Sequence, residues 1–228
     1  MPENTQATRR RPPARGVVAV LAVVALVAIA VAVPFTPAMP VRTIEVEGER
    51  QLSSDEIIAA TSIEEGTPIA RVDVQQAASD VAGLPWVKSA TVGRSWPSTI
   101  AVTVEEHVAV AYADTPEGSR LIDTRGEEFV VADPPEGAVQ LAGSALENER
   151  VRRDAVAIVT SISEEMRGRV ASIEASSPST FVLRLDDDRR VVWGASKDND
   201  NKARALETVV HREGAEFNIS NPELVTVR

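Results

Sequence analysis

The feature that most constrains this chain is an uncharged apolar run from Gly16 to Phe35. A helix of that length is about 30 Å long, which matches the hydrocarbon thickness of a bilayer. The run therefore predicts one membrane span over residues 16–35, with large apolar side chains distributed along it at Val17, Leu21, Leu26, Ile29 and Val33.

The charges on either side of the run predict its orientation. The tail, residues 1–15, contains four arginines and a single acid, Glu3, so its formal charge is +3. The whole chain carries −10, so the region after Phe35 carries −13. Basic residues are retained on the cytoplasmic side of a span. We therefore expect a cytoplasmic tail and an extracytoplasmic region over residues 36–228.

A cleaved signal peptide is the alternative interpretation of the same residues, because it also combines a basic segment with an apolar one. The apolar core Val17–Val33 is longer than the roughly 7 to 15 residues of a signal peptide, and Ala30–Ala32, an Ala-x-Ala sequence, lies inside the run and not after it. These observations favour a retained anchor, whose helix we expect Pro34 and Pro37 to end.

Composition excludes several kinds of chemistry. The chain has no cysteine, so it has neither disulfides nor a thiol nucleophile nor a zinc site with cysteine ligands. The strongly acidic region after Phe35 disfavours nucleic acid as a partner. None of the common nucleotide-binding, zinc-protease or serine-hydrolase motifs occurs. We predict no catalytic, cofactor-binding or metal-binding residues, and hence no enzyme.

Three polar features could in principle carry chemistry. His107 follows Glu105 and Glu106 and could act as an acid or base, but a solvated imidazole at a strand end is the better explanation. His211 suits the last turn of a helix. The acidic run Asp186–Asp188 lacks the glycine and glutamate of a calcium loop, so we interpret it as a hairpin tip.

Residues 41–110 predict a compact α+β unit. A strand over 41–47 precedes a helix that starts with the capping box Ser53 and Glu56, and a second capping box, Asp73 and Gln76, starts a helix over 73–82. Two strands, 86–94 and 99–106, then form a hairpin whose second strand alternates apolar and polar residues. The order is strand, helix, helix, strand, strand.

Residues 111–228 predict a mixed, β-rich domain with two helices. The helices are expected over 149–166 and 201–211, where apolar residues recur at helical spacing. Alternating or short apolar segments predict the strands, at 108–112, 120–123, 127–131, 170–174, 181–185, 190–193, 217–219 and 224–227.

Several of these segments resemble one family. The strand VRTIEVEG, the helix start LSSDEI and the segment LPWVKSATVGRSWPSTIAVTVEEHVAVA, placed directly after a single span, resemble the POTRA domain of the FtsQ/DivIB family of bacterial cell-division proteins. RLIDTRGEEF, RRVVWG and FNISNPELVTVR are similar to parts of that family's β-domain. The most specific piece is a hairpin motif, for which we expect a structural role with a half-buried tryptophan: Arg94, Trp96, Pro97 and Ser98.

The resemblance implies a membrane scaffold of the division septum. Its partners would be single-span division proteins of the FtsB/DivIC and FtsL types, with an FtsK-type translocase as a further partner. The FtsB-type partner would bind at the end of the β-domain, at Leu224, Val225, Thr226 and Val227. Two alternatives stay open: a POTRA-containing secretion or assembly factor, and an exported hydrolase with a cleaved signal peptide.

Overall fold

The computed structural model describes residues 14–177 and 179–228, and the chain divides into two compact units. The first ends at Leu84 and takes in Ser89–Glu105, while the second consists of Pro85–Lys88 and Glu106–Arg228. Each unit is built around its own β-sheet. The described part of the chain therefore has two separate cores.

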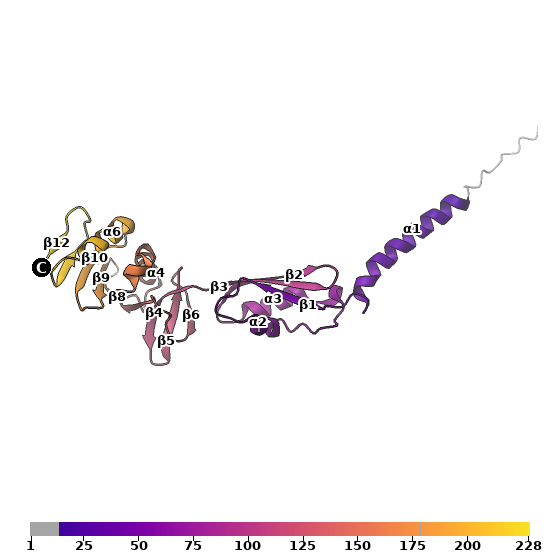
Figure 1. Cartoon of the computed structure of the whole chain (residues 1–228), viewed down its shortest axis with the longest axis horizontal. Helices are drawn as coiled ribbons and strands as arrows, with labels where there is room; N and C mark the ends of the chain where they lie inside the picture. The colour runs from indigo at the N-terminus through magenta and orange to yellow at the C-terminus, as the bar shows by residue number, and fades with distance from the viewer. Residues whose placement is uncertain (1–13, 178) are drawn as a thin grey trace, which may run out of the picture. The chain divides into compact units, whose positions relative to one another are not determined.

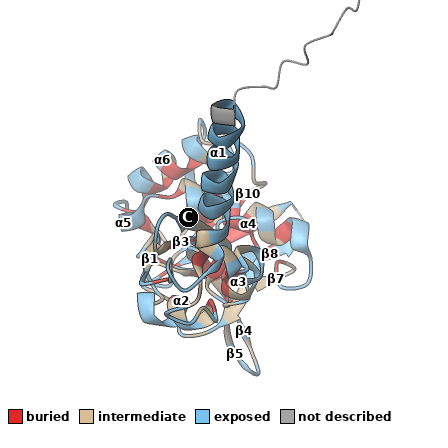
Figure 2. Cartoon of the chain, turned by 90° about the vertical axis from the view of Figure 1, so that its right-hand side faces the viewer, coloured by how far each residue is buried: buried red, intermediate tan, exposed pale blue. Residues whose placement is uncertain are grey.

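The apolar run forms helix α1 (Ala14–Ala32), which a short 3-10 turn follows, η1 (Val33–Phe35). The α-helix ends before Pro34, as expected. Residues 16–32 are all exposed, which Figure 2 shows as a pale blue helix. Among the described residues, this is the one helix that is long and apolar enough to cross a membrane. Its length and composition suit a bilayer as surroundings.

The sheet of the first unit has three strands, with β3 (Thr99–Glu106) between β1 (Thr43–Glu47) and β2 (Val87–Ser95). Strand β1 runs parallel to β3. Helices α2 (Ser54–Ala60) and α3 (Val74–Ala82) lie along this sheet (Figure 1), and the 3-10 turn η2 (Ile69–Arg71) precedes α3. The buried side chains of β3 alternate as predicted, at Ile100, Val102 and Val104.

The starts of the two helices differ in one predicted detail. Ser53 and Glu56 form a complete capping box, in which the Ser53 amide donates to the Glu56 carboxylate at 2.9 Å. Asp73 also caps its helix, but the predicted return bond from the Gln76 side chain is wrong, because Nε2 of Gln76 donates to Oδ1 of Asp80 at 2.8 Å. A side chain four residues further along the helix is a competing partner.

The sheet of the second unit has nine strands in the order β12-β11-β10-β9-β8-β7-β4-β5-β6. Neighbours are parallel at β4–β7, β7–β8 and β10–β11 and antiparallel elsewhere. The strands are β4 (Ala109–Thr115), β5 (Gly118–Asp123), β6 (Glu128–Val131), β7 (Val139–Gly143), β8 (Val170–Ser177), β9 (Thr180–Leu185), β10 (Arg190–Gly194), β11 (Glu216–Asn218) and β12 (Thr226–Val227).

Three helices accompany this sheet, where the sequence predicted two. The helix expected over 149–166 is divided into α4 (Glu149–Ser161) and α5 (Glu164–Arg167), because Ile162 is extended. The hydroxyl of Ser161 donates to the carbonyl of Ile158, a local bond that competes with the helical pattern. Ile162 nevertheless stays buried, so the apolar pattern did not reveal the break. The third helix is α6 (Asn199–Val209).

Strand β7 was not predicted. Its sequence, VQLAG, contains glutamine, alanine and glycine, which favour strands weakly. Parallel pairing with β4 on one side and β8 on the other places it inside the sheet, where Val139 and Leu141 are buried. Helix α4 packs on β4, β7 and β8 and on α6, which closes the core around Trp193, Phe181 and Phe217.

Candidate partner-binding surfaces

Only the end of the predicted partner-binding segment, β12 (Thr226–Val227), is a strand, and it forms an edge of the nine-stranded sheet, while Leu224 and Val225 precede it. Strand β12 pairs with β11 alone, with Phe217 opposite Val227 and Asn218 opposite Thr226. The last residue continues the ladder, since the Arg228 amide donates to the Glu216 carbonyl at 2.9 Å and the Glu216 amide donates to the Arg228 carbonyl at 3.0 Å. Among the described residues, no strand lies beyond β12.

These hydrogen bonds determine which backbone groups of β12 face outward. In an antiparallel ladder, residues alternate between a pair that exchanges both hydrogen bonds and a pair that exchanges none. Because Arg228 and Glu216 exchange both, Val227 falls at a position where its N–H and C=O point away from β11. This arrangement leaves an outward-facing donor and acceptor at the free edge.

Apolar side chains border this edge. Leu224 is 69% exposed and Val227 is 39% exposed, while Val225 packs against the core. The predicted alternation therefore holds for Val225, but Val227 remains accessible. An exposed leucine and valine beside unpaired backbone groups form the kind of surface that accepts an added strand.

The strand next to this edge, β11, is held in place by buried contacts. Phe217 of β11 is fully buried, and the guanidinium carbon of Arg189 lies 5.5 Å from the centroid of its ring. Arg189 also donates to the carbonyls of Val210 and Arg212, at 2.9 and 3.1 Å. It thereby fastens the β9–β10 hairpin and the end of α6 beneath β11. Sequence reasoning missed this role, since an arginine in an acidic turn gives no sign of its distant acceptors.

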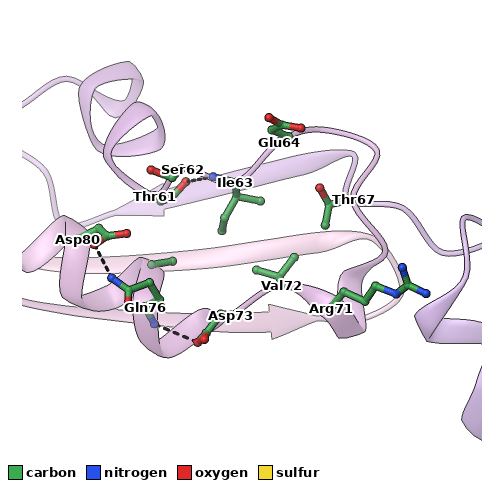
Figure 3. A pocket seen from close by; sticks show the side chains of 11 residues that line it. Thr61, Ser62, Ile63, Glu64, Thr67, Arg71, Val72, Asp73, Gln76 and Asp80 are labelled. Carbon is green, nitrogen blue, oxygen red and sulfur yellow. Dashed lines mark hydrogen bonds between the residues drawn. The ribbon is translucent and has the colours of Figure 1, made fainter.

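A second candidate surface is a hollow of about 280 Å³ in the first unit. Figure 3 shows its lining, which comes from the loop after α2, from η2 and from the first turns of α3. Three carboxylates line it, those of Glu64, Asp73 and Asp80, beside Arg71. Asp73 and Asp80 already accept hydrogen bonds from residues of α3, so the geometry is that of a helix cap and not of an acid and base pair.

Within the hairpin motif, Arg94 has a structural role. Its guanidinium donates to the carbonyls of Ile69 and Val72, which joins the β2–β3 hairpin to the turn η2 and to the start of α3. Trp96 is 55% exposed. Slightly less than half of its surface is covered, which is close to the half-buried state expected.

His107 is not the solvated imidazole that we expected. Its side chain is 11% exposed, its Nδ1 lies 3.0 Å from Oδ2 of Asp123, and its ring stacks on Phe129 at 4.6 Å. Asp123 is buried and also accepts from the amides of Arg125 and Glu127. These bonds fasten the turn between β5 and β6, which is a structural use of the histidine.

The other polar features agree with structural interpretations. His211 lies just beyond α6 and is exposed, and not within its last turn as predicted. Asp186–Asp188 form the tip between β9 and β10, where Asp187 is paired with Arg189. Within residues 14–177 and 179–228, no group of three or more acidic or histidine side chains is arranged to hold a metal ion.

Comparison with protein families identifies both units. Residues 39–107 match the model of the POTRA domain, FtsQ-type, and residues 111–225 match the model of the cell division protein FtsQ/DivIB C-terminal region. The class of protein is thus a POTRA protein with one candidate membrane helix at its amino end and an FtsQ/DivIB-type β-rich region.

Curated relatives agree with the models. The cell division protein FtsQ of Corynebacterium glutamicum is 37% identical over 93% of this chain and 96% of its own length. The FtsQ protein of Mycobacterium tuberculosis H37Rv is 33% identical over 96% of this chain and 72% of its own length. The chain belongs to the FtsQ/DivIB family of cell-division proteins, which confirms the family predicted from the sequence.

One solved structure is also similar. It is the major extracytoplasmic domain of the trans isomer of the cell-division protein DivIB from Geobacillus stearothermophilus, which is 13% identical and covers 45% of this chain and 87% of its own. Its TM-score is 0.35, so the family assignment rests on the sequence comparisons.

Proposed function

We propose that this protein is a single-pass membrane scaffold of the bacterial division machinery. In this proposal residues 1–15 are a cytoplasmic tail and residues 16–35 span the cell membrane. A POTRA-type domain over 41–110 and a β-domain over 111–228 lie outside it. The scaffold gathers other division proteins at the septum and catalyses no reaction itself. Membership of a cell-division family supports the cellular role.

The observation that carries the binding role is the free edge at β12. Val227 presents outward backbone groups, Leu224 presents an exposed apolar side chain, and Arg189 with Phe217 holds the supporting strand in place. We assign this edge, Leu224 to Val227, to a partner of the FtsB/DivIC type that adds a strand to the sheet. A protein of the FtsL type and an FtsK-type translocase are the further partners proposed.

The cellular role is tested by following the protein through division. A fluorescent protein fused to the amino end should gather at the division site of growing cells, and depletion of the native protein should produce elongated cells that fail to divide. Cells that divide normally after complete depletion, with the fusion spread evenly over the membrane, would contradict the scaffold role.

The topology is tested separately by protease accessibility. In intact cells stripped of their wall, added protease should remove residues 36–228 and spare an epitope placed at the amino end. The expectation follows from the basic tail, since positively charged segments are retained in the cytoplasm. A protected carboxyl end would contradict the orientation, and release of processed protein into the medium would instead support a cleaved signal peptide.

A further inference from the structure

Trp96 is the exposed tryptophan of this chain. It occupies the turn between β2 and β3 and is 55% exposed, whereas Trp193 is fully buried and Trp86 is partly buried against the ring of Phe129. A tryptophan has a large apolar ring and one N–H donor, so it is favoured where one end of a side chain is apolar and the other is wet.

The turn that carries Trp96 lies at the end of the first unit where the chain enters it. The register places Thr43 beside Thr99, in parallel strands that both begin at this end. The Arg42 amide donates to the Ser98 carbonyl at 2.9 Å, which fixes the turn beside the residue preceding β1. Figure 1 shows the β2–β3 turn and the start of β1 at the same end of the sheet.

Very little chain separates this end from the apolar run. The run ends at Phe35, and Met39 is already part of the folded unit, since its carbonyl accepts from the Ile69 amide at 3.0 Å. Pro40 and Pro68 form a β-bridge directly afterwards. Four backbone steps from Phe35 to Met39 reach at most about 14 Å. The polar headgroup layer of one leaflet is itself about 5 to 8 Å thick.

We propose that the β2–β3 turn contacts the membrane interface through the indole of Trp96. This inference rests on the proposed membrane span of α1, because the span is what holds this end of the unit at the bilayer. Tryptophan is enriched at the level of the lipid headgroups, where its ring meets acyl chains and its N–H meets polar groups. The contact orients the first unit as a second point of attachment beside the span.

Charges at this end indicate which lipids are needed. Arg42 and Arg71 are exposed here and suit phosphate groups, but Glu64 and Glu65 lie in the adjoining loop and oppose them. The balance of charge is close to even, so the indole and not an anionic lipid provides the contact. The interaction is therefore expected with zwitterionic phosphatidylcholine as well as with phosphatidylglycerol.

The test uses the full chain reconstituted into phosphatidylcholine vesicles whose acyl chains carry bromine near the headgroup end, which quenches nearby tryptophan emission. We expect quenching of the native protein and its loss in Trp96→Ser. As a matched control, Trp96→Ser combined with Thr103→Trp moves the indole along the hairpin to an exposed position opposite Glu47. That position is about 13 Å further along β3 than Thr99, so its emission should not be quenched.

Each outcome bears on a different claim. Flotation of the protein with the vesicles, together with quenching that depends on Trp96, supports the contact. Flotation with equal quenching in the native protein and in Trp96→Ser overturns the contact alone, and so does equal quenching from the indole at position 103. Failure of the full chain to float with the vesicles overturns the proposed span and the contact together. No other protein is present, so a partner protein cannot produce the signal.

Discussion

The guanidinium of Arg94 donates hydrogen bonds to the backbone carbonyl of Val72, and also to that of Ile69 at 3.0 Å. These bonds tie the β2–β3 hairpin to the turn η2, which lies more than twenty residues earlier in the chain. A planar guanidinium supplies several donors in a fixed arrangement, so one side chain satisfies two carbonyls that the short turn leaves without strand partners.

Arg94→Ala should therefore destabilise the first unit. Loss of hydrogen bonds from a charged donor to partly buried carbonyls is expected to lower the free energy of unfolding by about 1 to 3 kcal/mol. Arg94→Lys should fall between the alanine variant and the native protein, because an ammonium group keeps the charge but not the fork. Urea unfolding of a soluble form lacking residues 1–38 measures this. Equal stability of all three proteins would show that the two bonds contribute nothing.

Trp96→Ala should have little effect on the stability of the same soluble form. The side chain is 55% exposed, and exposed substitutions usually change the free energy of unfolding by less than about 0.5 kcal/mol. Ile100→Ala is the matched comparison, because Ile100 starts the buried face of β3 and is fully buried. Ile100→Ala should lower the free energy of unfolding by about 2 to 5 kcal/mol. A large loss in Trp96→Ala would mean that the indole packs on the folded unit in solution.

Asp123→Asn tests the polar cluster in the second unit. The carboxylate is 1% exposed and accepts from the amides of Arg125 and Glu127, at 2.8 and 2.9 Å, as well as facing His107. An asparagine side chain keeps one acceptor oxygen but places an N–H₂ donor where the second carboxylate oxygen was. We therefore expect the free energy of unfolding to fall by about 1 to 3 kcal/mol. Asp133→Asn, at an exposed loop position, is the control and should leave the unfolding midpoint unchanged.

The pairing of Asp187 with Arg189 predicts a pH dependence. A hydrogen bond from the Arg189 side chain is the main cause of the lowered pKa of Asp187. A carboxyl whose pKa is lower in the folded than in the unfolded state stabilises the fold above its unfolded pKa, and that contribution disappears as pH falls through the folded pKa. Asp187→Asn should thus be less stable than the native form near neutral pH and equally stable in acid.

The measurement is chemical unfolding of both proteins at a series of pH values from about 7 down to about 2, which passes below the ordinary aspartate pKa of about 3.9. The difference in the free energy of unfolding between the two proteins should stay nearly constant from about pH 7 to about pH 5 and narrow below it. A gap that stays constant across the series would show that the ion pair is not the source of any stability difference.

The sequence predicted most elements because their signals are local. The Ser53 capping box and the alternation of Ile100, Val102 and Val104 depend on neighbouring residues alone, and the structure contains both. Strand β7 was missed for the opposite reason, since partners on both sides and not its own composition make VQLAG a strand. The break at Ile162 was hidden because the residue keeps its place in the core after the helix ends.

The candidate site also combines features that the sequence predicts with features that depend on tertiary structure. The family resemblance placed the partner site at Leu224–Val227, and among the described residues β12 lies at the edge of the sheet. The outward direction of the Val227 backbone depends on the ladder between Arg228 and Glu216, and the support from Arg189 depends on acceptors more than twenty residues away. Both arise from tertiary structure, which the alternation of a short segment cannot reveal.

The central claim is that a partner strand adds to the free edge of β12, and Val227 is the residue that tests it most directly. Val227→Pro removes an N–H that points away from β11, so it removes a bond to a visiting strand and leaves the bonds between Arg228 and Glu216 in place. Val227→Thr is the matched control, because it keeps the amide and a β-branched side chain.

The measurement is a calorimetric titration of each soluble variant with the extracytoplasmic part of an FtsB-type protein. Circular dichroism first verifies that both variants remain folded. We expect Val227→Pro to weaken binding by about tenfold or more, which corresponds to the loss of one backbone hydrogen bond of about 1.4 kcal/mol, while Val227→Thr binds like the native protein. A folded Val227→Pro variant that binds with native affinity would contradict the edge-strand account.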